Sequence, residues 1–176
     1  NYQPDILAKT LSSKRDLFFA VLMPVSVNED FWSAPRKGIE KAISEIGHFG
    51  ITIKYYLFDQ NDRASFDQQC EKLFTDIPDA ILFAPVFPHE SSNFLKGCRK
   101  SDIPVILFNS NLDDMKNASY IGQDSIKSGE VAARLMWYSL NNGDRLIVAN
   151  PAARKENHNH LIRRERGFGH QRRWSG

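Results

Sequence analysis

The stretch Leu17-Phe-Phe-Ala-Val-Leu-Met-Pro-Val25 decides how this chain folds. An uninterrupted apolar run, rich in residues that favour β-structure, is typical of a strand that is buried on both faces. A polar turn with Phe31 and Trp32 follows, and then Ser33 and Pro35, which suit the start of a helix. The sequence therefore predicts a central strand that ends in a loop carrying two aromatic side chains.

The pattern of a strand followed by an amphipathic helix repeats along the rest of the chain. Further strands are predicted at 51–58, 80–86, 103–108, 119–121 and 144–150, and helices at 39–46, 66–77, 90–100, 125–140 and 157–168. Short connections between alternating strands and helices imply right-handed crossovers, so the predicted fold is α/β, a doubly wound parallel sheet with helices on both faces. The 176 residues suffice for one domain with a substantial core, or one domain and part of another.

Composition and charge narrow the function. No run reaches membrane-spanning length and no signal peptide opens the chain, which predicts a cytoplasmic protein. Residues 154–173 hold seven Lys or Arg against two Glu, a net charge of +5, so that the remainder carries −3 of the formal total of +2. The globular part therefore lacks the basic face that non-specific nucleic-acid binding requires.

Cysteine and histidine usage predicts neither a metal nor a cofactor. Cys70 and Cys98 lie far apart in predicted helices and are expected to be reduced packing residues, with a disulfide as the alternative. His158 and His160 are one residue apart without a nearby third ligand, which is more typical of a solvated loop than of a metal pair.

The signatures of catalysis and of nucleotide binding are missing. The first strand-to-helix turn has no glycine cluster, and Gly-x-x-x-x-Gly-Lys does not occur. The third strand ends in Ala84-Pro85-Val86, without the carboxylate that a phospho-acceptor domain needs. No serine sits in a nucleophile elbow. We therefore expect a protein that is not an enzyme; an enzyme of flavodoxin-like topology is a third, more distant hypothesis, which measurable turnover would support.

The opening residues, Tyr2-x-Pro4-x-x-x-Ala8-x-x-Leu11, resemble the hinge-helix segment of lac-repressor family transcription regulators. The likeness extends over residues 1–168. Its motifs are Phe31-Trp32 ahead of Gly38-Ile39, Ile103-Pro104-Val105, Tyr120-Ile121-Gly122-Gln123-Asp124 with Gly129, and Arg164-x-x-Gly167-Phe168.

The resemblance implies a periplasmic-binding-protein type I fold, in which two similar lobes clamp a small ligand, often a sugar. On this view residues 1–12 are the hinge-helix segment, 13–142 the N-terminal lobe, 143–168 the first βα unit of the second lobe, and 169–176 an unassigned tail. The helix-turn-helix head and most of the second lobe are expected to be missing. The strand at 146–149 would then pair with the edge of its own sheet or with a second chain.

The resemblance also implies the site residues. Phe31 or Trp32 would lay an aromatic face against the sugar ring, and Asp124 would accept hydrogen bonds from two hydroxyls. Arg164 would reach over from the second lobe with its planar donor fork. Asn109 follows the fourth strand where the family often has Asp-Arg, so a charged grip on the ligand is weakened.

Each of these assignments has a structural alternative. The two aromatic side chains would seal the end of the core, Asp124 would simply cap a helix, and Arg164 would be one more solvated base in the basic tail. Asn28 is not assigned a role, because Glu29 stands at the position of the family's cleft asparagine.

The favoured hypothesis is the effector-sensing and dimerising domain of a DNA-binding transcription repressor, with no membrane partner. In the full-length homodimer Tyr2, Ala8 and Leu11 would contact operator DNA, with Leu11 wedged into the minor groove. The alternative is a soluble periplasmic-type sugar-binding protein for transport or chemosensing. A gene that begins with a signal peptide instead of a DNA-binding head would favour that alternative.

Overall fold

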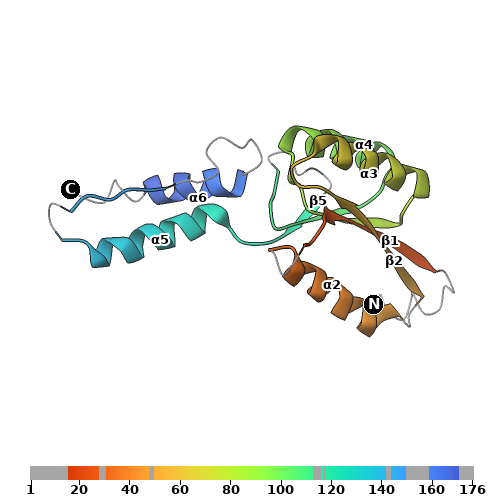
Figure 1. The fold of residues 1–176 in the computed structure, drawn as a ribbon, viewed down its shortest axis with the longest axis horizontal. Helices are drawn as coiled ribbons and strands as arrows, with labels where there is room; N and C mark the ends of the chain where they lie inside the picture. Colours follow the sequence, from red (N-terminus) through yellow and green to blue (C-terminus); the bar gives the residue numbers. More distant parts are fainter. Residues whose placement is uncertain are drawn as a thin grey trace, which may run out of the picture.

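A five-stranded parallel sheet forms the centre of the protein (Figure 1). The computed structural model describes residues 16–27, 31–47, 50–112, 116, 118–141, 144–149 and 159–170. The strands lie in the order β2-β1-β3-β4-β5. Their bounds are β1 Leu17–Pro24, β2 Ile51–Phe58, β3 Ala80–Phe83, β4 Val105–Phe108 and β5 Ala118–Ile121. All four strand pairs are parallel, which confirms the predicted fold class.

Three of the described helices connect strands, and two more follow β5. They are α2 (Ser33–Ile46), α3 (Arg63–Asp76), α4 (Pro88–Lys100), α5 (Ser125–Ser139) and α6 (Asn159–His170). Helix α4 begins two residues before the predicted start, because a proline in the first helical turn loses no backbone hydrogen bond. Prolines also shorten two strands. Ala84 N–H still donates to Leu22 O at 2.9 Å, but Pro85 has no N–H to donate, and β4 begins only after Pro104.

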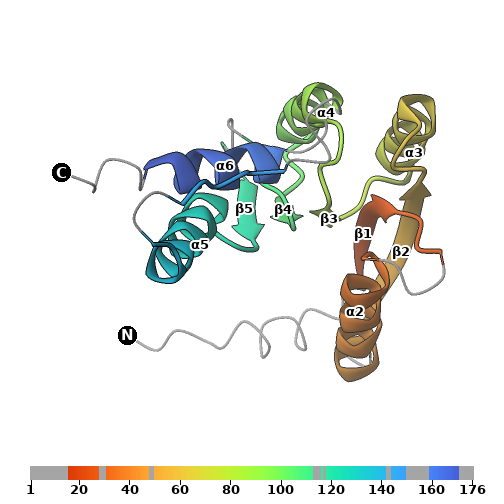
Figure 2. The same cartoon turned by 60° about the vertical axis from the view of Figure 1, so that its left-hand side comes forward.

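Alternate residues of β1 serve two separate cores. Ala20 and Leu22 face α3 and α4, within a cluster rich in phenylalanine. Val21 and Met23 face the opposite side of the sheet, where Trp32 and Ile39 pack. Figure 2 shows α3 and α4 on one side of the sheet and α2 on the other. Because β1 is covered on both faces, it carries the continuous apolar run from which the fold was predicted.

The sixth predicted strand is wrong for the part that the structure describes. Residues 144–149 are irregular and do not join the sheet, and Ile147 is 88% exposed. Its apolar composition favours a strand, but a strand also needs a neighbour to satisfy its backbone groups. Pairing with the edge of its own sheet is therefore excluded in this structure, and pairing with a second chain stays a prediction.

Helices α5 and α6 lie side by side and extend away from the sheet (Figure 1). Two glycines let them approach closely. A Cβ atom at Gly129 would lie 2.0 Å from the carbonyl oxygen of Arg164, and one at Gly167 would lie 2.0 Å from that of Ile126. Helix α5 precedes the proposed lobe boundary at residue 142 and α6 follows it, and the two helices pack on each other. The boundary itself stays a prediction.

Both cysteines are free and buried, as predicted. Burial raises the pKa of Cys98 to about 12, and burial, with the charge of Asp67, raises the pKa of Cys70 well above its usual value. Across the described ranges, no helix combines the length and apolarity needed to cross a membrane.

We expect Cys70 and Cys98 to react with an aromatic disulfide reagent on the order of 100-fold or more slowly than a free thiol, because the reactive species is the thiolate. Absorbance of the released thiol measures the rate. The same chain in denaturant, where both should react at once, is the control. Rapid labelling of the folded chain would contradict this packing.

Candidate functional site

The carboxyl ends of the parallel strands meet at one edge of the sheet, and the segments that follow β1, β4 and β5 carry the predicted site residues. The strand order reverses between β1 and β3, since β2 lies on one side of β1 and β3 on the other. In open α/β sheets, ligands bind beyond the carboxyl ends of the strands, next to such a reversal. The site is therefore sought at this edge, which we call the carboxyl edge.

The two aromatic residues after β1 have different roles. Trp32 is only 6% exposed, lies edge-on to Phe108 with ring centroids 6.4 Å apart, and donates its indole N–H to Gln60 Oε1 at 3.1 Å. Phe31 is 63% exposed and packs edge-on against Trp32 at 5.1 Å. Trp32 thus closes the end of the core, as its structural alternative proposed, and Phe31 presents its ring to solvent.

Tyr120 holds the segments after β4 and β5 together. Its hydroxyl lies 3.1 Å from the carbonyl oxygen of Asn109 and 3.0 Å from that of Gln123, and it can donate its proton to either. Asn109 itself adopts a left-handed backbone with φ of 67°, which asparagine tolerates well. The Tyr120 ring covers Gly122, where a Cβ atom would lie 2.2 Å from the hydroxyl oxygen. Asn109 is therefore fixed at the carboxyl edge by its backbone.

Asp124 caps α5. Its Oδ1 accepts a hydrogen bond from the backbone N–H of Lys127 at 3.0 Å, and its carbonyl oxygen accepts one from Ser128 at 2.8 Å. The residue is nevertheless exposed. The structural alternative for Asp124 is thus observed, and its role as an acceptor for a ligand stays a prediction.

Three side chains of α6 form hydrogen bonds with residues of the carboxyl edge. Arg164 Nη2 donates to Gln123 Oε1 at 2.8 Å, and Arg163 Nη1 donates to Asn111 Oδ1 at 3.0 Å. His160 Nδ1 lies 3.1 Å from Ser110 Oγ. Arg164 is therefore not merely a solvated base, because it bridges α6 to the segment after β5.

The charged side chains near Tyr120 affect the pKa of its hydroxyl. Burial raises the pKa of the Tyr120 hydroxyl, the guanidinium groups of Arg163 and Arg164 oppose the rise, and the carboxylate of Asp124 adds to it. Four groups from β5, the start of α5, and α6 thus share one electrostatic environment. Two of them, Asp124 and Arg164, are residues that the sequence nominated.

Sequence reasoning did not nominate six residues that make contacts at the carboxyl edge: Gln60, Ser110, Asn111, Gln123, His160 and Arg163. The polar triplet 109–111, directly after a buried strand, was a usable signal for Ser110 and Asn111. The contacts of His160 and Arg163 depend on the docking of α6, for which the sequence carries no local signal.

Among the described residues, no three His, Cys, Asp or Glu side chains form a metal-binding group. His158, Tyr2, Ala8 and Leu11 lie outside the described residues.

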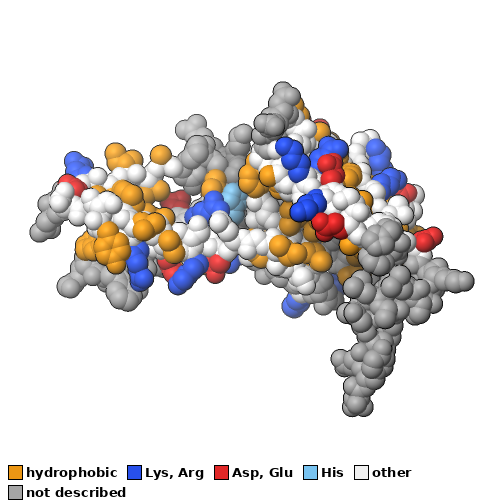
Figure 3. Space-filling view, turned by 90° about the horizontal axis from the view of Figure 1, so that it is seen from below, with side chains coloured by type: hydrophobic (Ala, Val, Ile, Leu, Met, Phe, Trp, Pro, Cys, Tyr) orange, Lys and Arg blue, Asp and Glu red, His pale blue; other side chains and the backbone are white. Residues whose placement is uncertain are grey.

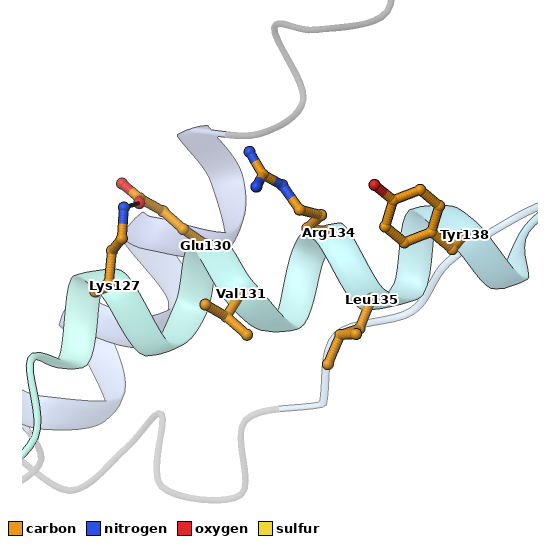
Figure 4. A pocket seen from close by; sticks show the side chains of 6 residues that line it. All are labelled: Lys127, Glu130, Val131, Arg134, Leu135 and Tyr138. Carbon is orange, nitrogen blue, oxygen red and sulfur yellow. Dashed lines mark hydrogen bonds and ion pairs between the residues drawn. The ribbon is translucent and has the colours of Figure 1, made fainter.

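Three hollows lie among the described residues, and one of them, of about 250 Å³ between α5 and α6, has Arg164 in its lining. The other two lie away from the carboxyl edge. One, of about 140 Å³, is a shallow strip along a single face of α5, lined by Lys127, Glu130, Val131, Arg134, Leu135 and Tyr138 (Figure 4). Another, of about 390 Å³, lies beside β2 and α3 and is lined by Lys54, Tyr55, Tyr56, Gln69, Lys72, Thr75 and Asp76. Neither contains a residue that the sequence nominated.

Helix α5 also exposes several apolar side chains. The exposed fractions of Val131, Leu135, Trp137 and Tyr138 are 51%, 62%, 62% and 79%. Figure 3 shows apolar side chains gathered over the end of the molecule formed by α5 and α6. This surface follows from the packing of α5 on α6, which leaves the opposite face of α5 in solvent.

Comparison with known proteins places this geometry in a family. The model of the periplasmic binding protein domain matches residues 19–169. The ribose import binding protein RbsB of Bacillus subtilis is 27% identical over 143 residues, which are 80% of this chain and 45% of that protein.

Solved structures agree on the fold. A protein from Bacteroides fragilis assigned as a LacI transcriptional regulator is 26% identical, with a TM-score of 0.77, over 92% of this chain and 56% of that one. An ABC transporter solute binding protein from Bacillus halodurans, solved with bound myo-inositol, is 20% identical, with a TM-score of 0.77, over 89% of this chain and 52% of that one. The chain thus spans about half the length of these relatives. The match over residues 19–169, together with the parallel sheet, shows that the chain belongs to the periplasmic binding protein domain family.

Proposed function

We propose that this chain is the effector-sensing domain of a transcription repressor and that its effector, a sugar, binds at the carboxyl edge. The observation that carries the proposal is a continuous series of contacts along that edge. It runs from the exposed Phe31 ring through Trp32 to Phe108. From Asn109, the next residue in the chain, it continues through Tyr120 and Gln123 to Arg164. An apolar ring face, a capping carboxylate and a guanidinium are the groups that recognise a sugar's C–H face and its hydroxyls.

The exposure of each side chain decides the role that we assign to it in the site. Phe31 supplies the aromatic face, because the ring of Trp32 is buried. Asp124 accepts from ligand hydroxyls while its Oδ1 also caps α5, and Asn109 and Arg164 complete the polar contacts. The proposal assigns no catalytic step to any of these residues.

The regulatory part of the proposal is supported by the resemblance of residues 2–11 to a hinge helix and by the likeness to the Bacteroides fragilis protein that is assigned as a LacI regulator. In the full-length homodimer, ligand binding would be transmitted to Tyr2, Ala8 and Leu11 on operator DNA in the cytoplasm. A shift of the mobility of operator DNA that the sugar reverses would support this; unchanged mobility would contradict it.

A second candidate function is solute binding for sugar transport or chemosensing. The similarity to the ribose import binding protein and to a myo-inositol complex favours it. It shares the site but involves no DNA. Binding of a sugar together with the failure to bind any DNA would therefore select this candidate over the repressor.

The test of the site is a thermal-shift screen of pentoses, hexoses and inositol against the complete gene product, followed by Asp124→Asn. Asparagine caps helices about as well as aspartate, so stability should be retained while the charge is lost. A charge-assisted hydrogen bond contributes about 1.5 to 3 kcal/mol, against about 1 kcal/mol for a neutral one, which predicts a roughly tenfold weaker affinity.

Asp124→Ala is the matched control, because it removes both the cap and the charge. We expect it to lower stability by about 1 kcal/mol as well as affinity. An unchanged sugar response in Asp124→Asn would leave Asp124 only its capping role. The absence of any response to sugars in the wild-type protein would refute the proposed function itself.

A further inference from the structure

The guanidinium groups at the carboxyl edge are paired with neutral oxygens. Arg163 donates to the side-chain amide of Asn111, and Arg164 donates to that of Gln123. The ion pairs formed by other arginines within the described ranges, Arg36 with Glu40 and Arg63 with Glu90, lie elsewhere on the protein. Among the described residues, these two positive charges of α6 therefore have amide oxygens, not carboxylates, as their hydrogen-bond partners at the edge.

Arg164 also has a donor that is not used. Its Nε is buried, and no acceptor lies within hydrogen-bond distance of it among the described residues. A buried donor without an acceptor costs about 1 to 3 kcal/mol. In a guanidinium, Nε and a neighbouring Nη form one side of a planar fork that matches the two oxygens of a carboxylate or a phosphate. Only one half of that fork is engaged, by the Gln123 amide.

The charged groups that act on Tyr120 within the described ranges are unevenly divided. Asp124 supplies one negative charge, which is felt at Tyr120, against the two guanidiniums. The residues directly after β4, Asn109, Ser110 and Asn111, carry no charge, and Asp113 and Asp114 further along lie outside the described residues. Glu165 lies on α6 beside Arg164, but it is exposed to solvent. Among the described groups that act on Tyr120, two guanidiniums thus face one carboxylate.

From this arrangement we infer that the ligand of the carboxyl edge is a sugar that carries an acidic group, a carboxylate or a phosphate. The inference rests on the proposed function and names its ligand class. The acidic group takes the place of the Gln123 amide oxygen on Arg164, engages Nη2 and Nε together, and draws Arg163 from Asn111. Charge-assisted, bidentate bonds then replace single bonds to neutral amides, and the unused Nε gains an acceptor.

Titration calorimetry on the complete gene product tests this with matched ligands: glucose against glucuronate and glucose 6-phosphate, and galactose against galacturonate. We expect an acidic sugar to bind at least about tenfold more tightly than its neutral counterpart, and the preference to shrink as salt is raised. Glucuronate and the 6-phosphate separate the two sources of the acidic group. Inorganic phosphate alone shows whether the charge suffices without the sugar.

Arg163→Gln should remove most of the preference for the acidic sugar while neutral sugars still bind. Arg164→Gln should also remove the preference, and it should weaken the binding of neutral sugars as well, because Arg164 belongs to the proposed sugar site. Arg166→Gln, an exposed arginine of the same helix, is the matched control and should retain the preference. Circular dichroism and thermal melting would reveal whether Arg164→Gln separates α6 from the sheet. If it does, Arg163→Gln still tests the inference.

Two outcomes separate this inference from the proposed function. Neutral sugars that bind as tightly as acidic ones would overturn the inference and leave the sugar-binding function intact. Failure of every sugar, neutral or acidic, would overturn both. A preference for acidic sugars that persists in both arginine variants would also overturn the inference, because other residues would then bind the acidic group.

Discussion

Phe66→Ala is expected to lower the free energy of unfolding by about 3 to 5 kcal/mol, the largest effect of any substitution considered for this protein. Phe66 lies on α3 and is 1% exposed. Its ring stacks on Phe83 at 5.9 Å and contacts Phe58, Phe87 and Phe94, with ring centroids between 5.1 and 6.4 Å away. Truncation would remove the ring on which this aromatic cluster is centred.

Urea denaturation followed by far-UV circular dichroism measures this loss. Phe66→Leu keeps most of the volume and should cost less than the alanine variant. Phe31→Ala removes a ring that is largely in solvent and should change stability by about 0.5 kcal/mol or less. If Phe66→Ala and Phe31→Ala were equally stable, α3 would not be packed on the sheet as described here.

Gly129→Ala is expected to separate α5 from α6, at a cost of about 1 to 3 kcal/mol. The new methyl group would lie 2.0 Å from the carbonyl oxygen of Arg164 and 2.8 Å from the backbone nitrogen of Phe168. Backbone atoms of a helix cannot turn aside as a side chain can, so the whole helix must shift. Arg164 would then lose its contact with Gln123, and ligand affinity should fall together with stability.

Hydrogen exchange measures the result, because the amides of α6 should lose protection while those of β1 and β3 keep theirs. Gly169→Ala, on α6, is the matched control. Its Cβ atom meets nothing within 4 Å, and alanine is favoured over glycine in a helix by roughly 1 kcal/mol. That variant should be neutral or stabilised. Unchanged protection of α6 in Gly129→Ala would show that the two helices do not pack through this glycine.

The difference between Phe31 and Trp32 shows how far the sequence can define the site. Their neighbouring positions after an apolar strand indicate a loop at the carboxyl edge, and the structure places them there. Which ring is buried depends on partners far away in the chain, Gln60 and Phe108. Nothing in the local pattern distinguishes the two residues, so both were nominated.

The apolar run at 146–149 shows the opposite limit. Composition favoured a strand, but strand formation depends on a neighbouring strand, and α5 leads this segment away from the sheet. Local preference therefore predicted an element that the tertiary arrangement does not support.

By itself, the sequence determined the alternation of strands and helices and the parallel sheet, because hydrophobic periodicity and capping residues act over a few neighbouring positions. It also determined that Asp124 stands at the start of a helix. Only the tertiary structure decided that α6 docks on the segments after β4 and β5, that Arg163 and Arg164 meet neutral amides, and that Phe31 rather than Trp32 is exposed. The contacts of the two arginines join residues up to 52 positions apart, and their geometry depends on the packing of whole helices rather than on any local pattern.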